Sequence, residues 1–122
     1  MVGGGDAAVT EALYLAELCA HVHILVRGDA LRAENIWVEK ANAKENITIH
    51  FNTAIEEIQG NFGVESVLLK DGSSMTIDGV FIAVGSDPDT KLLDSFGPEK
   101  DSTGCIVVDK RQATSIPGVY AA

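Results

Sequence analysis

Hydrophobic residues over the first 50 positions recur with two different spacings, which predicts alternating strands and helices. Short β-branched runs indicate strands, whereas apolar residues three or four positions apart indicate helices. The expected elements are a strand ending at residue 2, a helix over 6–20, a strand over 21–26, a helix capped by Asp29 over 29–43, and a strand over 47–50. Strands and helices that alternate in this way form parallel sheets joined by right-handed crossovers.

From residue 52 onward the apolar runs become short and closely spaced. They lie at residues 54–58, 64–69 and 74–77. Turns separate them, and Asp71-Gly72 is a strong hairpin signal, so a three-stranded antiparallel meander is expected in place of a crossover helix. Residues 79–84 are continuously apolar, which is typical of a strand covered on both faces of a parallel sheet.

The rest of the chain has a weaker pattern. Residues 86–104 predict a long loop, residues 106–108 a short strand, and residues 118–122 a core strand that stops as it emerges. Only two residues of the first strand precede the first glycine. We therefore expect one domain over residues 1–122, truncated at both ends and cut from a longer protein.

The turn between the first strand and the first helix carries the most informative motif. Its six residues are Gly3, Gly4, Gly5, Asp6, Ala7 and Ala8, which follow the pattern G-x-G-x-x-A. The first glycine of this pattern allows a tight turn, the next lets the backbone approach a pyrophosphate, and the alanine keeps the helix close to the sheet. We assign all six residues to a dinucleotide cofactor, whose phosphates would rest on helix N–H groups.

This motif and the element order together predict the fold class. We expect a three-layer Rossmann-like (FAD/NAD(P)-binding) α/β domain. Its central parallel sheet would carry helices on one face and the three-stranded meander on the other.

The residues after the second strand bear on which nucleotide is bound. Arg27 and Arg32 stand where a 2′-phosphate would need cations, whereas NAD-binding proteins usually place Asp or Glu there. This favours NADPH and leaves NADH open, and the alternative is that both arginines are solvated surface charges. Gly85 follows the strand at 79–84, where a side chain would obstruct a nicotinamide ribose; it is alternatively a turn glycine before Pro88.

Composition narrows the partners. The formal charge is −9, and no basic stripe is present, so nucleic acid is not expected as a partner. No apolar run approaches the ~18 residues that span a bilayer, so we expect no membrane partner. For the location we expect the cytoplasm, although the sequence constrains it only weakly.

The residues that most often carry chemistry form no visible reaction centre. Cys19 and Cys105 belong to no C-x-x-C pair, and buried, inert thiols are expected. His21 and His23 share one strand face without a third ligand, so no metal site is expected. No nucleophile has an identifiable base, and we therefore assign no catalytic residue.

Four stretches, in order, resemble the pyridine-nucleotide-binding domain of low-molecular-weight thioredoxin reductases and related two-dinucleotide flavoproteins. Residues 3–15 are similar to G-G-G-[ND]-x-A-x-E-A-x-x-L, residues 22–33 to V-x-L-[IV]-H-R-R-x-x-x-R-A, residues 82–90 to [IV]-A-I-G-x-x-P-N-T, and residues 114–122 to T-S-x-P-G-V-[FY]-A-A-G-D without its last two residues. The resemblance covers nearly the whole chain.

The resemblance implies more than this chain contains. It implies a separate FAD domain, a redox-active C-x-x-C upstream of the first strand, a thioredoxin-like partner and a homodimer, all for the parent protein only. The isolated chain is expected to be inactive. Where the family has His-Arg-Arg, this chain has Val26-Arg27-Gly28, so modest discrimination between NADPH and NADH is expected.

The function expected from residues and resemblance together is to position NADPH for hydride transfer to FAD and on to a disulfide in the parent flavoprotein. Two alternatives stay open. One is a domain of a ferredoxin-NADP reductase-like flavoprotein without the disulfide, and the other is a nucleotide-binding module without turnover.

Overall fold

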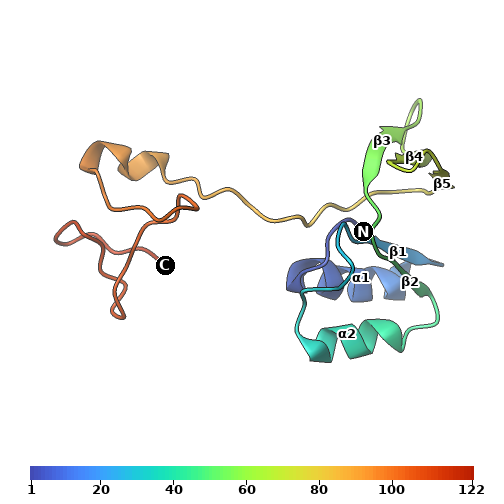
Figure 1. Ribbon diagram of the computed structural model, residues 1–122, viewed down its shortest axis with the longest axis horizontal. Helices are drawn as coiled ribbons and strands as arrows, with labels where there is room; N and C mark the ends of the chain where they lie inside the picture. The colour runs from blue at the N-terminus through green and yellow to red at the C-terminus, as the bar shows by residue number, and fades with distance from the viewer. The chain divides into compact units, whose positions relative to one another are not determined.

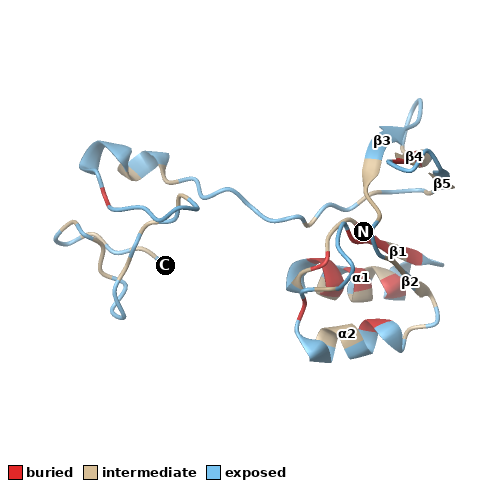
Figure 2. Cartoon of the chain, viewed as in Figure 1, coloured by how far each residue is buried: buried red, intermediate tan, exposed pale blue.

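The computed structural model describes residues 1–122, which form two compact units over residues 1–84 and 85–122 (Figure 1). The sequence predicted a single domain over residues 1–122, and this stays a prediction. The buried core residues all lie in the first unit, and Pro98 is the one buried residue of the second unit (Figure 2). The second unit has no comparable core.

A parallel sheet forms the centre of the first unit. Strands β1 (Val22–Leu25) and β2 (Ile47–His50) pair in parallel, with Val22 opposite Ile47. Val2 adds a bridge to β1 at Leu25 and another to Ile82, both parallel. The order across the sheet is therefore Ile82, Val2, β1, β2. Ile82 and Val2 take part through single bridges and do not form full strands.

Two helices cover one face of this sheet. Helix α1 (Asp6–Leu18) and helix α2 (Asn35–Asn42) lie side by side (Figure 1). Alternate residues of the β1 segment, Val22, Ile24 and Val26, join the alanines of α1 in one buried cluster. A second cluster, with Val9 at its centre, holds α2 against α1.

The meander covers the opposite face. It consists of β3 (Ile55–Gln59), β4 (Ser66–Leu69) and β5 (Ser74–Thr76), paired antiparallel in that order. Leu25 alternates to this side of β1 and packs with Val67 and Leu69 of β4. The three-layer α/β fold and the placement of helices and meander on opposite faces are confirmed.

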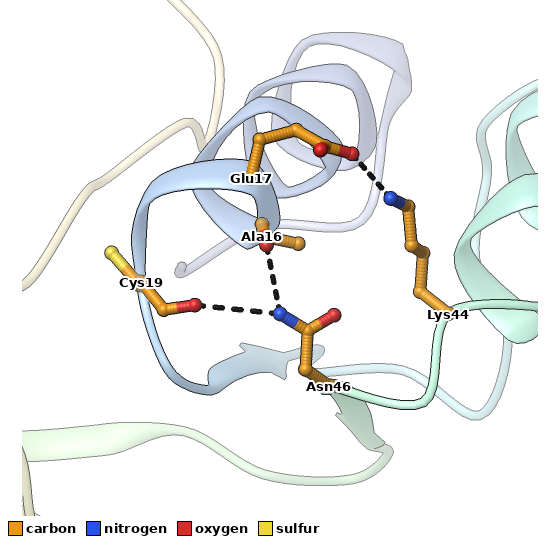
Figure 3. A network of polar contacts seen from close by, with 5 residues as sticks. All are labelled: Ala16, Glu17, Cys19, Lys44 and Asn46. Carbon is orange, nitrogen blue, oxygen red and sulfur yellow. Dashed lines mark hydrogen bonds and ion pairs between the residues drawn. The ribbon is translucent and has the colours of Figure 1, made fainter.

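The end of α1 is joined to the start of β2 by side chains (Figure 3). Asn46 Nδ2 donates to the carbonyl oxygens of Ala16 at 2.8 Å and Cys19 at 3.4 Å. These carbonyls lack helical partners, so the amide satisfies groups that would otherwise need water. Lys44 also forms an ion pair with Glu17.

The second helix is shorter than predicted. It begins at Asn35 and not after Asp29, because the preceding backbone is bonded elsewhere. The N–H groups of Arg32 and Ala33 both donate to the carbonyl oxygen of Gly4, at 2.7 and 3.1 Å. A backbone whose donors are used by another segment cannot also form a helical turn.

The apolar run at residues 79–84 also differs from its prediction. Only Ile82 pairs, and the side chains of Phe81, Ile82 and Val84 are 51%, 62% and 53% exposed. The expected cover on both faces is therefore not observed. A continuous apolar run specifies a preference for burial, but it does not specify which segment provides the cover.

The second unit consists mostly of turns. Its one helix is the 3-10 helix η1 (Lys91–Phe96). The strands expected at 106–108 and 118–122 are reduced to single bridges at Ile106 and Tyr120. Carboxylates explain the curled backbone, since Asp101 and Asp109 each accept backbone N–H groups two and four residues ahead.

The longest helix, α1, has 13 residues, and none of the helices has the length and apolarity needed to cross a bilayer.

The core cluster generates a stability prediction. Ile24 is fully buried, whereas Ile58 of β3 is 45% exposed. Ile24→Ala should lower the free energy of unfolding by about 2–5 kcal/mol through lost burial and a residual cavity. Ile58→Ala, the matched control, should cost under about 1 kcal/mol. Urea unfolding followed by fluorescence of Trp37, the chain's one tryptophan, measures both; equal losses would contradict this account of the core.

Candidate functional site

The glycine-rich turn, residues 3–8, leads from Val2 directly into α1. Gly3 has φ +140° and donates its N–H to the carbonyl oxygen of Leu25 at 3.1 Å. A Cβ at Gly3 would collide with the carbonyl oxygen of Ala83. Packing within the protein therefore requires glycine at this position, as the predicted tight turn implied.

The middle of the turn shows two different requirements. A Cβ at Gly4 would lie 2.9 Å from Cγ1 of Val26, so the neighbouring strand excludes a side chain there. Gly5 has φ −90°, and a Cβ on it would meet nothing within 4 Å. Packing within the protein therefore does not require glycine at position 5, and the space next to it is open.

Gly5 is also the N-cap of α1, and no side chain caps this helix. The first turn of an uncapped helix presents N–H groups that can bind an anion. Asp6 and Ala7 are exposed in this turn, while Ala8 is fully buried against the sheet. Ala8 thus has the packing role that its place in the motif predicted.

A cleft of about 540 Å³ opens beside the turn. Its lining residues are Val2, Gly3, Gly4, Leu25, Val26, Arg27, Gly28, Asp29, Ala30, Arg32 and Val84. Of the residues assigned from the sequence, Gly3, Gly4, Arg27 and Arg32 line this one cleft. Residues 5–8 form the adjoining turn and helix start and are not part of the lining. Gly85 belongs to the second unit, and its assignment to the cofactor stays a prediction.

The two arginines in the cleft have no anionic partner. Arg27 and Arg32 are both exposed, and neither takes part in an ion pair. In a chain of net charge −9, two unpaired guanidinium groups beside a helix N-terminus form a local site for an anion. Guanidinium groups bind phosphate through forked, charge-assisted hydrogen bonds.

Asp29 lines the same cleft, although the sequence analysis treated it only as a helix cap. Because the helix starts later, Asp29 is free to face a ligand. A carboxylate can accept hydrogen bonds from ribose hydroxyls, which is the role of the acidic residue in NAD-binding proteins. The sequence signal that could have assigned Asp29 to the site was its position close after the second strand.

Histidines gather on the meander side of the parallel sheet. His23 and His50 approach to 3.0 Å between Nδ1 and Nε2, and the ring centroids of His21 and His23 are 4.7 Å apart. The sequence analysis missed His50, which the parallel register places opposite Leu25 and hence on the same face. No group of three potential ligands is arranged to hold a metal ion.

Both cysteines are exposed, so the predicted buried thiols are wrong. Cys19 follows the last residue of α1, and its N–H closes the helix on the carbonyl oxygen of Leu15. Cys105 lies in a turn of the second unit, where its N–H donates to Asp101. Helical spacing placed Cys19 on the buried face, but the helix ends one residue before it.

Comparisons with known proteins agree with this geometry. A family model described as pyridine nucleotide-disulphide oxidoreductase matches residues 1–122. Thioredoxin reductase of Treponema pallidum is 40% identical over 127 residues, which cover all of this chain and 41% of the relative. The crystal structure of Lactococcus lactis thioredoxin reductase matches 98% of this chain and 41% of its own, with 36% identity and a TM-score of 0.88. That of T. acidophilum thioredoxin reductase matches 99% and 41%, with 38% identity and a TM-score of 0.88.

The histidine cluster yields a pH prediction. Burial holds the pKa of His23 below its ordinary value of 6.5, and positive charges on His21, His50 and the chain's amino terminus lower it further. The unfolded chain therefore takes up this proton first as the pH falls, so the contribution of His23 to stability declines below about pH 6.5.

His50→Gln should raise the pKa of His23 part of the way toward 6.5, because one like charge is removed while burial stays. NMR titration of the His23 imidazole measures this pKa. Lys70→Ala, which removes an exposed charge beyond β4, is the control and should leave the titration unchanged. An unaltered His23 titration in His50→Gln would show that the cluster is not electrostatically coupled.

Proposed function

Because the chain belongs to the pyridine nucleotide-disulphide oxidoreductase family, we propose that the cleft beside the glycine-rich turn binds NADPH. The observation that carries the proposal is that Gly3 and Gly4 line the same cleft as two guanidinium groups without ion-pair partners. A dinucleotide phosphate has two anionic groups, a pyrophosphate and a 2′-phosphate, and the cleft offers a place for each.

The residues divide this task between them. Backbone N–H groups of the turn, next to the open space at Gly5, would hold the pyrophosphate. Arg27 and Arg32 would hold the 2′-phosphate through charge-assisted hydrogen bonds. The nicotinamide would extend toward Val84, which lines the cleft at the carboxyl end of the 79–84 segment, where doubly wound sheets bind ligands. A bound reduced nicotinamide supplies a hydride.

The same residues bear on selectivity. Val26 and Gly28 offer no polar side chain to a 2′-phosphate, and Asp29 offers a carboxylate to ribose hydroxyls. The arginines favour NADPH, whereas Asp29 accommodates NADH. We therefore propose that NADPH is preferred and that NADH also binds.

The chain spans about two fifths of the length of the relatives it matches. For the whole protein we propose a thioredoxin reductase-like flavoprotein in which residues 1–122 act as the NAD(P)H-binding domain. Hydride would pass from the nicotinamide to FAD in another domain and then to a disulfide that reduces a thioredoxin-like partner. A cytoplasmic homodimer is part of this proposal.

The turn is tested by placing a charge where phosphate must approach. Gly5→Asp should abolish NADPH and NADH binding in calorimetric titration, because a carboxylate would occupy the pyrophosphate position. The fold should stay intact, since a Cβ at position 5 meets open space. Gly5→Ala is the uncharged control and should retain more affinity than Gly5→Asp. Unchanged affinity in Gly5→Asp would overturn the assignment of the turn.

The arginines are tested by nucleotide preference. Replacing both Arg27 and Arg32 with Ala should weaken NADPH binding by about 1.5–3 kcal/mol for each arginine and change NADH binding by less than about twofold, because only NADPH has the 2′-phosphate. Lys70→Ala removes an exposed cation that does not line the cleft and should change neither affinity. Equal losses for both nucleotides in the arginine variant would mean that the pair does not select.

A further inference from the structure

Arg32 lies in a loop, residues 29–34, that has no regular secondary structure. The side chains of Asp29, Arg32 and Glu34 are exposed, so their own packing does little to fix the loop. A long, exposed arginine side chain loses rotamer entropy when it binds a phosphate, and a mobile backbone would add to that cost. The contribution of Arg32 to phosphate binding therefore depends on what holds this loop in place.

Three hydrogen bonds from backbone N–H groups of the loop tie it to the glycine-rich turn. The N–H groups of Arg32 and Ala33 donate to the carbonyl oxygen of Gly4, at 2.7 and 3.1 Å. The N–H of Glu34 donates to Oδ1 of Asp6 at 2.8 Å. Ala33 is 8% exposed and packs in the cluster around Val9, which anchors the loop from its apolar side.

Asp6 is the one member of these contacts that acts through a side chain. Its carboxylate stands in the first turn of α1, next to the backbone that would receive a pyrophosphate. A negative charge there repels that ligand, so anion binding alone does not account for an aspartate at this position. The bond to Glu34 does account for it, because a carboxylate is a strong acceptor for a backbone N–H.

We propose that Asp6 is a positioning residue that holds the loop so that Arg32 reaches the 2′-phosphate, and that it thereby sets the preference for NADPH over NADH. This inference rests on the proposed function. The two phosphate sites of the cleft are then one unit: the turn that receives the pyrophosphate also fixes the loop that carries Arg32. Asp6 was assigned from the sequence to the cofactor itself, and this inference gives it an indirect role.

The proposal is tested with the full chain by calorimetric titration of NADPH and NADH separately. Asp6→Ala removes the acceptor and should lower the ratio of NADPH to NADH affinity about threefold to tenfold, the range expected for one hydrogen bond. Loss of the negative charge lessens repulsion of the pyrophosphate, which both nucleotides carry, and its effect on the 2′-phosphate would raise the ratio and not lower it. Asp6→Asn keeps an acceptor oxygen and should retain most of the ratio.

A second pair of variants removes the donor in place of the acceptor. Glu34 has φ −57°, which proline adopts, so Glu34→Pro deletes the N–H without forcing this angle to change. It should lower the ratio as Asp6→Ala does, and the two changes combined should have no larger effect than either alone. Glu34→Ala keeps the N–H and is the matched control. Circular dichroism establishes that each variant is folded.

The outcomes separate the inference from the function on which it rests. If the wild type binds neither nucleotide, the proposed function fails and the inference with it. If the wild type prefers NADPH while folded Asp6→Ala and Glu34→Pro keep its ratio, only the inference is overturned. Equal losses for both nucleotides would also overturn it, because they would indicate a general structural role. In an Arg32→Ala background, Asp6→Ala should leave the ratio unchanged.

Discussion

The close passage of Gly3 between two neighbouring segments is the constraint on which the site depends. The N–H of Gly3 donates to Leu25 on one side, while Ala83 lies too close on the other side for any Cβ. Val2 is fixed in the same way, through bonds to Phe81 and Ala83. Because these contacts hold the chain on both sides, the turn leaves the sheet in one direction only. The start of α1, the loop over residues 29–34 and the cleft are positioned from this point.

Sequence reasoning succeeded where local pattern and tertiary structure agree. The third strand was predicted at 47–50 and forms β2 with the same bounds, because its β-branched residues pair directly with β1. The motif at residues 3–8 gave the turn, since Gly3 is required by backbone packing that any such turn shares. Four of the nine residues assigned to the cofactor line the cleft.

It failed where a distant segment determines local structure. The start of α2 depends on the carbonyl oxygen of Gly4, about 30 residues earlier, and no local periodicity reports that contact. His50 lies close to His21 and His23 because of the register between β1 and β2, and that register is known only once the two strands are seen to pair. Exposure of Cys19 depends on where the helix ends, and helix ends are the least predictable part of a helix.

The bare N-cap of α1 has a consequence for how the sequence can vary. Serine, aspartate or asparagine at position 5 would cap the helix and gain a few tenths of a kcal/mol over glycine, and the backbone there has room for them. Folding stability therefore does not require glycine at this position. Glycine here forgoes a small gain in folding free energy, so lineages that do not use the open space above the turn would be free to replace it.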